Sequence, residues 1–261
     1  MYAQDIAFWA DAMINADKPE HRLSASETFE QEFLTSLNQE NSYYNKYNNL
    51  EWISIQYPQD SSFRILSWQI DRGDGDYIYQ GFYQDQTRLV PFDPTNGDAG
   101  LDEDEPIEIK NWSGALVYRI VQIDDQYMLW TFRYLDRYNK VKTCEPFTMT
   151  GDKLTLGSAI FQEEENSPNY SFRHIMQYSA DMNATLDFNA DSQRIIFDNL
   201  VMVGGRMEGQ GIAYVADGSY RAYSYDNGKW IAIDKVFDQV LDRAPRQRKK
   251  RAQKDLFGKK G

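Results

Sequence analysis

The chain has 261 residues, 41% hydrophobic and 26% charged, and its 40 acidic against 28 basic side chains give a formal net charge of −12. This length fits one large domain or two small ones. The single cysteine, Cys144, excludes an internal disulfide framework and multi-cysteine metal sites, and the two histidines, His21 and His174, leave little material for zinc or histidine-based catalysis. No apolar run reaches about 18 residues, so the sequence predicts no membrane-spanning helix.

The first forty residues predict two helices. In the first, apolar side chains at intervals of three and four form one stripe, made of Tyr2, Ile6, Trp9 and Met13. Pro19 is expected to end this helix, because the residue before a proline avoids the helical conformation. The second helix is expected to begin at a cap formed by Ser24 or Ser26. It places Phe29, Phe33 and Leu37 on one face, so we expect both helices to pack on the rest of the chain.

From Glu51 the apolar period changes from 3.6 to 2, which predicts an antiparallel β domain over residues 51–242. Twelve strand-length segments follow one another at 52–57, 63–70, 77–83, 87–92, 115–123, 127–135, 140–147, 170–178, 184–188, 193–202, 220–225 and 229–236. Asn227-Gly228 is the clearest turn signal, since a type I′ hairpin needs two positive φ angles. Short connections favour antiparallel meander sheets over parallel ones.

A weak repeat runs through this domain, in which an aromatic residue precedes an arginine at Phe63-Arg64, Tyr118-Arg119, Phe172-Arg173 and Tyr220-Arg221. The intervals are 55, 54 and 48 residues. Units of about 50 residues with several strands each favour a propeller-like arrangement. A sandwich or an open barrel is the alternative, because so short a motif also recurs by chance in a chain with 15% aromatic residues.

Charge is unevenly divided. Residues 243–261 contain nine Lys and Arg and one acid, which leaves −20 for residues 1–242. A body this acidic is expected to repel nucleic acid. The basic end predicts a disordered tail. It is either a solvated terminus that lies on the acidic body, a tether to an anionic surface or nucleic acid, or a strap that docks on an acidic partner through Arg246, Arg248, Lys249, Lys250 and Arg251.

The start of the chain suggests export. Tyr2-Ala3-Gln4 resembles the end of a bacterial secretory signal, with a small residue at the cut and Gln opening the mature chain. No charged and apolar leader precedes it. The expectation of a secreted or periplasmic protein therefore requires a start upstream of Met1, and the alternative is a chance match.

Five segments carry a resemblance to a known family: 62–69 (SFRILSWQ), 111–118 (NWSGALVY), 173–179 (RHIMQYS), 195–200 (IIFDNL) and 217–230 (DGSYRAYSYDNGKW). They resemble an uncharacterised family of secreted or envelope β-rich proteins of Bacteroidetes, over roughly residues 25–236. The resemblance implies a secreted or envelope location and a β-rich fold. It implies no catalytic residue.

Two acidic loops are candidate calcium sites, and no other cofactor is expected. Asp71, Asp74 and Asp76 stand between two predicted strands, and residues 93–106 contain six acids. Calcium takes six to eight oxygen ligands. The spacing departs from an EF-hand, so a hairpin turn and a solvated insertion are the alternatives, and the second loop could also receive the basic tail.

Catalytic patterns are weak. His174 lies in a predicted strand without a nucleophile motif, Cys144 has no activating neighbour, and nothing selects a carboxylate pair from 40 acids. Trp68, Trp112 and Trp130 are candidate sugar-stacking residues, with core packing as the alternative. We therefore expect a non-enzymatic secreted or periplasmic protein that binds a partner or glycan at the cell envelope. A glycan-acting hydrolase with paired carboxylates and an assembly subunit that docks through its basic tail are the alternatives.

Overall fold

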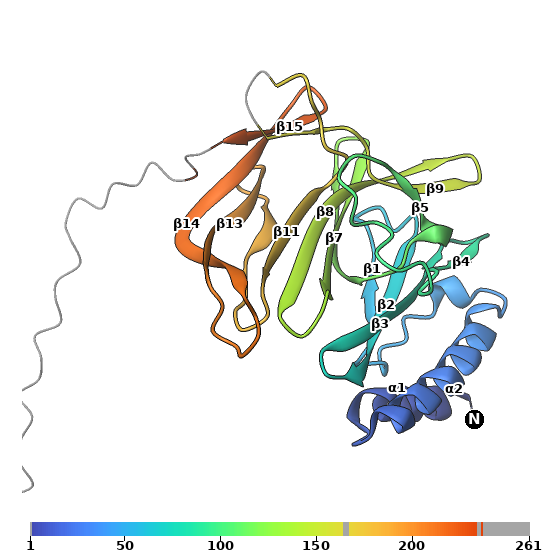
Figure 1. Cartoon of the computed structure of the whole chain (residues 1–261). Helices are drawn as coiled ribbons and strands as arrows, with labels where there is room; N and C mark the ends of the chain where they lie inside the picture. The colour runs from blue at the N-terminus through green and yellow to red at the C-terminus, as the bar shows by residue number, and fades with distance from the viewer. Residues whose placement is uncertain (1, 164–166, 234–235, 237–261) are drawn as a thin grey trace, which may run out of the picture.

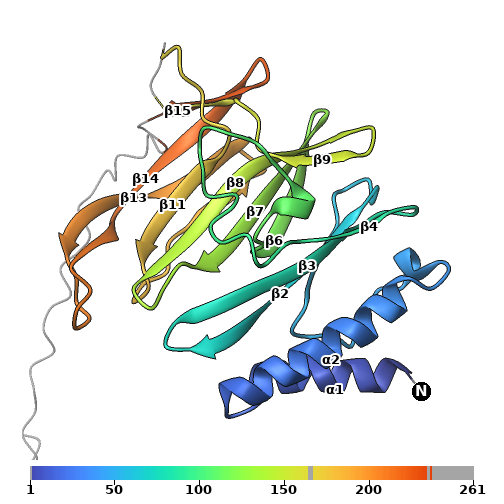
Figure 2. The ribbon, with the colours of Figure 1, turned by 45° about the vertical axis from the view of Figure 1, so that its right-hand side comes forward.

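A computed structural model describes residues 2–163, 167–233 and 236, and it stacks them in four layers (Figure 1). The first layer consists of the helices α1 (Tyr2–Asn15) and α2 (Pro19–Leu37). Three β-sheets lie behind it in succession, as the turned view in Figure 2 shows. The predicted mainly β fold with two N-terminal helices is confirmed.

The sheet next to the helices has the order β1-β2-β3-β4, with β1 (Ser54–Gln56), β2 (Arg64–Gly73), β3 (Asp76–Gln84) and β4 (Leu89–Pro91). The middle sheet has the order β5-β9-β8-β7-β6, and β11 pairs with β8. Its strands are β5 (Ile107–Glu108), β6 (Leu116–Ile123), β7 (Gln126–Tyr134), β8 (Asn139–Thr150), β9 (Lys153–Leu156) and β11 (His174–Ser179).

The third sheet has the order β10-β15-β14-β13-β12, in which β10 and β15 run parallel. Its strands are β10 (Phe161–Gln162), β12 (Leu186–Asn189), β13 (Arg194–Gly204), β14 (Ile212–Asp226) and β15 (Lys229–Ile233). Two 3-10 helices, η1 (Ser42–Tyr44) and η2 (Ile109–Asn111), lie in the connections. Asn227 and Gly228 join β14 to β15 with φ angles of 47° and 81°, which confirms the predicted hairpin turn.

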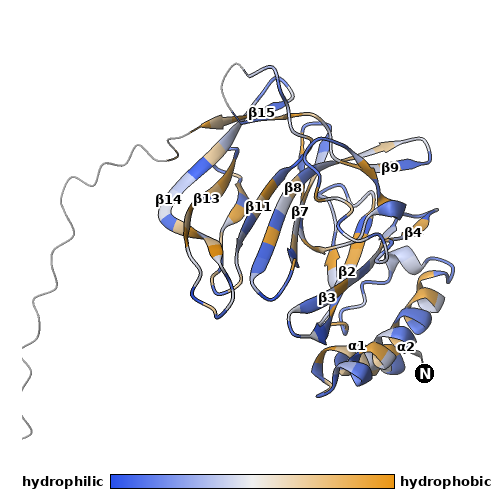
Figure 3. Cartoon of the chain, in the orientation of Figure 1, coloured by the Kyte–Doolittle hydropathy of each residue, from blue (hydrophilic) through white to orange (hydrophobic). Residues whose placement is uncertain are grey.

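The helices pack on one face of the first sheet. Phe29 and Phe33 of α2 meet Trp68 of β2 with ring centroids 5.1 and 6.1 Å apart. The predicted start of α2 is wrong, since it begins at Pro19, five residues before Ser24. Proline suits the first helical turn because its backbone nitrogen has no hydrogen to satisfy there. Among the described residues, no helix is both long enough and apolar enough to cross a membrane. Figure 3 shows hydrophilic positions on both α1 and α2.

The middle sheet is covered on both faces. Leu129 and Phe147 pack with Phe63, which directly precedes β2 of the first sheet. On the opposite face, Trp130 and neighbouring side chains pack with Trp230 of the third sheet. Alternate residues of one strand thus enter two separate cores, as the two-residue period of a strand requires.

The three stacked sheets resemble the sandwich that the sequence offered as an alternative to a propeller. The aromatic-arginine pairs do not mark repeated units of this fold. Arg64 opens β2, Arg119 lies inside β6, Arg173 precedes β11 and Arg221 lies inside β14. The sheets also have different strand orders and pack face to face. Helices α1 and α2 fall within the predicted helical segment 1–40 and the described strands fall within 51–242, while 243–261 lies outside the described residues.

Two of these four arginines are fully buried. Arg64 is 0% exposed and Arg173 is 1% exposed. Arg173 Nε lies 2.8 Å from the Glu145 carboxylate, which is itself 0% exposed. The same guanidinium donates hydrogen bonds to the backbone oxygens of Asp102 and Glu105. This arginine therefore holds the connection before β5 against the middle sheet.

Replacing Arg173 by Met is expected to lower the free energy of unfolding by about 3–5 kcal/mol, because Glu145 is left as an unpaired buried charge. The double variant Arg173→Met/Glu145→Leu should recover part of that loss. Arg119→Met is the matched control, since Arg119 pairs with Asp187 near the surface, where an ion pair contributes about 1 kcal/mol or less. Urea unfolding measures the free energy of unfolding of all three variants. Equal losses of stability for Arg173→Met and Arg119→Met would contradict the role of Arg173 as the partner of a buried charge.

The turn between β3 and β4 depends on one carboxylate. Asp85 accepts hydrogen bonds from the backbone N–H groups of Thr87 and Arg88 at 2.8 and 2.7 Å and from the Tyr83 hydroxyl at 2.8 Å. Burial acts to raise the pKa of Asp85, but these bonds and the Arg88 guanidinium outweigh it and lower the pKa to about 2.

Asp85→Asn is expected to lower the free energy of unfolding at pH 7 by about 1–3 kcal/mol. A depressed carboxyl pKa stabilises the fold above the unfolded pKa of about 4, and that stabilisation is lost as the pH falls through about 2. The difference between variant and wild type should therefore shrink across this window. Urea unfolding at several pH values measures it, with Asp74→Asn, at an exposed turn position, as the control. A difference that did not change with pH would count against this role.

Candidate functional site

Strand β11 lies at the open side of the middle sheet. It pairs with β8 from His174 to Ser179, and no other described strand is hydrogen-bonded to it. Its second edge faces β13 and β14 of the third sheet (Figure 2). An edge strand keeps a row of backbone donors and acceptors without a ladder partner.

The backbone groups on this edge can be assigned. The N–H of Ile175 is directed at the Glu103 carboxylate, a hydrogen bond that opposes the rise in the pKa of that carboxyl caused by burial. In an antiparallel pair, successive residues alternate between bonding to the neighbouring strand and pointing away from it. Residue Gln177 therefore also presents its N–H and C=O to the open side.

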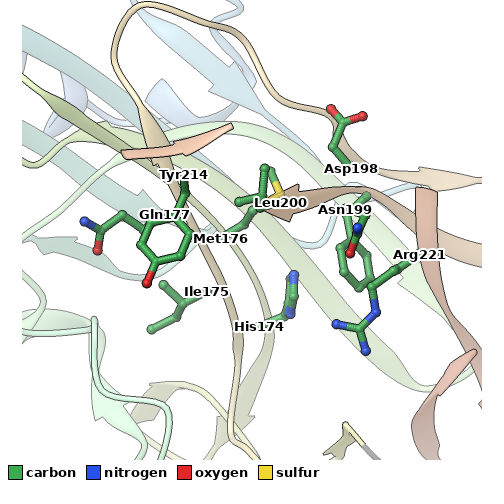
Figure 4. Close-up of a pocket in the computed structure, with 10 residues that line it drawn as sticks. His174, Ile175, Met176, Gln177, Asp198, Asn199, Leu200, Tyr214 and Arg221 are labelled. Atoms are coloured by element: carbon green, nitrogen blue, oxygen red, sulfur yellow. The ribbon is translucent and has the colours of Figure 1, made fainter. Parts of the chain in front are cut away.

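A cavity of about 430 Å³ separates this edge from the third sheet (Figure 4). Gln177 and Tyr214 lie on one side of it, while Asn199 and Arg221 lie on the other. The lining mixes apolar and polar groups, namely His174, Ile175, Met176, Gln177, Phe197, Asp198, Asn199, Leu200, Tyr214 and Arg221. Such a mixture is typical of ligand sites, where apolar contacts contribute affinity and a few polar groups fix orientation.

His174 is the central polar group of the lining. Its residue exposure is 8%, and its ring centroid lies 4.4 Å from that of Phe197. Nδ1 lies 3.0 Å from the Tyr223 hydroxyl. Nε2 is buried and has no hydrogen-bond partner among the described residues. In either tautomer Nε2 is left unsatisfied inside the protein, at a cost of about 1–3 kcal/mol.

Glu163 and Arg221 form the charged rim of the site. Glu163 follows β10, and its carboxylate lies 3.6 Å from His174 Nδ1 and 3.6 Å from the Arg221 guanidinium. Burial acts to raise the pKa of Glu163, but the hydrogen bond to His174 and the charges of His174 and Arg221 lower it below its usual value. Glu163 therefore stays ionised beside the cavity.

Glu103 lies on the connection that Arg173 holds against the sheet. Loss of hydration raises the pKa of Glu103, and the charge of Glu163 adds to that rise, while His174 and the Ile175 N–H oppose it. The two glutamates thus have pKa values shifted in opposite directions. Together they make the environment of the edge acidic.

Cys144 is the cross-strand neighbour of His174 in the β8–β11 pair. Burial raises the pKa of its thiol well above the usual value, and the charges of Glu145 and Asp187 add to the rise. A nucleophilic cysteine needs the opposite, a thiolate favoured by nearby positive charge. This supports the prediction that Cys144 is a structural residue.

The three predicted sugar-stacking tryptophans lie in the cores. Trp68, Trp112 and Trp130 are 0, 2 and 0% exposed. Stacking needs an accessible ring face, so in this structure these rings are packing residues. Period-2 alternation could not reveal this, because both faces of the first two sheets are covered.

The predicted metal residues are not brought together. Asp71 lies 3.6 Å from Arg22, Asp76 lies 2.5 Å from Arg72, and Asp74 occupies a turn position with a φ of 55°. Within the part of the chain that the structure describes, no three His, Cys, Asp or Glu side chains form a metal-binding group. The segment is the hairpin turn that the sequence offered as the alternative.

The tail residues Arg246, Arg248, Lys249, Lys250 and Arg251 lie outside the described residues. Sequence reasoning missed the role of Glu103, Glu163 and Tyr223. One signal was present: Arg173 and Arg221, both members of the aromatic-arginine pairs, contact the site from two sides.

Comparisons with protein-family models, with curated proteins and with solved structures find no match to this chain.

Proposed function

We propose that this chain is a non-enzymatic binding protein that takes up an extended, basic segment of a partner polypeptide as an added strand on β11. The observation that carries the proposal is the edge of β11 without a ladder partner, which lies beside a cavity that His174 and Gln177 help to line. A strand-addition site needs an open strand edge, a pocket for a partner side chain and charge that matches the partner, and this chain has a counterpart of each.

The backbone of β11 supplies the first part. Ile175 and Gln177 present their main-chain groups to the open side, and a partner strand satisfies such groups in regular order. The Glu103 carboxylate at the Ile175 N–H occupies the place where a partner carbonyl would accept. Affinity in this mode comes from main-chain hydrogen bonds, and specificity comes from pockets for alternate side chains.

The cavity supplies the second part. Phe197, Leu200 and Met176 offer apolar contact to one partner side chain, and His174 and Asn199 offer polar groups.

Charge supplies the third part. Glu103 and Glu163 flank the edge, Asp102 and Asp104 stand next to Glu103 in the chain, and residues 1–242 carry −20 overall. Such a field accelerates encounter with a basic segment and disfavours an acidic one. Location at the cell envelope is a separate part of the proposal, and none of these contacts bears on it.

The test uses peptides selected from a displayed random 12-residue library against the wild-type chain. We expect enrichment of Lys and Arg in the selected peptides. In calorimetry, Gln177→Pro should weaken their binding about tenfold, because it removes one main-chain donor on the open edge. Gln177→Ala is the matched control, since it removes the side chain and keeps the donor.

Circular dichroism melts establish that both variants fold, because an edge strand tolerates a proline whose nitrogen faces outward. Selection of no peptide, or equal binding to the Gln177→Pro and Gln177→Ala variants, would overturn strand addition. Selection of acidic peptides would overturn the choice of a basic partner.

A second candidate, a glycan-acting hydrolase, is favoured by the opposite pKa shifts of Glu103 and Glu163, since paired carboxyls with separated pKa values suit acid and base roles. We expect no release of reducing sugar from xylan, β-glucan or starch. Release that is abolished in Glu103→Gln but kept in Glu108→Gln would replace the binding proposal.

A further inference from the structure

We infer that a groove beside η1 and β1 is a second binding site, for a short oligosaccharide. Its volume is about 780 Å³, and it is formed by the segment from η1 to β1 together with the turn after β3. It lies against the first sheet, whereas the His174 cavity lies between the second and third sheets. The inference does not depend on the proposed peptide site.

The rings of the groove belong to tyrosines. Tyr43, Tyr44 and Tyr57 line it, and Tyr44 is 63% exposed. The Tyr43 ring meets Tyr44 and Tyr57 with centroids 5.6 and 6.5 Å apart in edge-to-face contacts. An accessible ring next to fixed rings provides the flat apolar surface on which the C–H face of a sugar packs.

The segment that carries these rings is fixed by Arg64. Its buried guanidinium donates to the backbone oxygens of Ser42 and Asn45 at 3.0 and 2.6 Å and to the Tyr57 hydroxyl at 2.9 Å. The guanidinium carbon also lies 5.6 Å from the Tyr43 ring centroid, within cation-π distance. The groove is therefore preformed, and a ligand does not have to order it.

The backbone beneath the groove is strained. Tyr47 lines the groove with a φ of 48°, a conformation that a bulky side chain rarely adopts. Its hydroxyl lies 2.9 Å from Ser36 Oγ, and its ring lies 5.1 Å from that of Phe33, so contacts with α2 hold it there. Strain of this kind persists where the surrounding structure fixes it, and it concentrates at binding sites.

The polar groups of the groove favour a sugar over other ligands. Asn48, Gln56 and Gln86 contribute carboxamides, which donate and accept hydrogen bonds at one position and so match hydroxyl groups. A purely apolar ligand would make no hydrogen bond to these carboxamides, of which Gln56 already donates to Ser54 Oγ. A highly anionic ligand would meet the net negative charge of the body, with Lys46 as the basic residue of the lining. A molecule with a flat apolar face and many hydroxyls can pack on the tyrosine rings and form hydrogen bonds with the carboxamides.

The experiment is affinity electrophoresis of the full chain in gels that contain starch, β-glucan, xylan, chitosan or polygalacturonate, followed by calorimetry with the matching tetrasaccharide. We expect retardation in at least one gel. Tyr44→Ala should weaken tetrasaccharide binding roughly tenfold, because it removes the exposed stacking ring. Phe8→Ala is the matched control, since Phe8 is 62% exposed on α1 and outside the groove, and its binding should match the wild type.

Gln86→Leu gives a second test, because it keeps the size of the side chain and removes the carboxamide. We expect weaker binding in this variant as well. No retardation in any gel, or equal loss in Tyr44→Ala and Phe8→Ala, would overturn the inference. Gln177→Pro should bind the tetrasaccharide like the wild type, so failure of the peptide site and failure of the sugar site are separately visible.

Discussion

The structure depends on two guanidinium groups that are buried inside a stack of sheets. A buried guanidinium has five N–H donors to satisfy, and the carbonyls inside a sheet already serve the neighbouring strands. Most of the backbone oxygens that Arg64 and Arg173 bind therefore lie outside the strands: Ser42 of η1 and Asn45 in one case, and Asp102 and Glu105 in the other, where Leu156 of β9 is a further acceptor. Each arginine thus fixes a connection that would otherwise be a solvated loop. The first of these connections carries the tyrosine groove, and the second places Glu103 at the edge of β11.

The position of both sites follows from the way the layers cover one another. The first two sheets are covered on both faces, so most side chains in the middle of their long strands pack into the cores. What remains is the rim: a connection beside β1 and the unpaired edge of β11. The length of β8 creates that edge, because its first half pairs with β11 while its second half pairs with β9. A strand that changes partners midway leaves each partner with one side uncovered.

Much of the fold could be predicted from the sequence, and the errors have physical causes. Alternation and turn residues located the long strands and the Asn227-Gly228 hairpin, because these signals are local. The short strands β5 and β10 have two residues each, too few to show a period. A two-residue period shows that side chains such as Trp68 and Trp130 alternate, but not that both faces of their sheets are covered. The aromatic-arginine pairs resemble a repeat in the sequence, and their role as buried anchors is hidden because the backbone acceptors of Arg64 and Arg173 lie 17 to 71 residues away in the chain.

The two proposed sites lie on separate layers of the stack, so both ligands can bind at the same time. The groove contacts the first sheet and η1, while the cavity contacts the second and third sheets, and no residue lines both. A sugar in the groove therefore leaves the β11 edge open to a polypeptide. If a glycan carries the partner polypeptide, binding of one ligand holds the other close to its own site on the same chain. The second binding step is then intramolecular, which raises the effective concentration of the second ligand without any new contact. Rigid attachment of both sites to one stack favours this effect, because the distance between them is set by packed sheets rather than by a flexible linker.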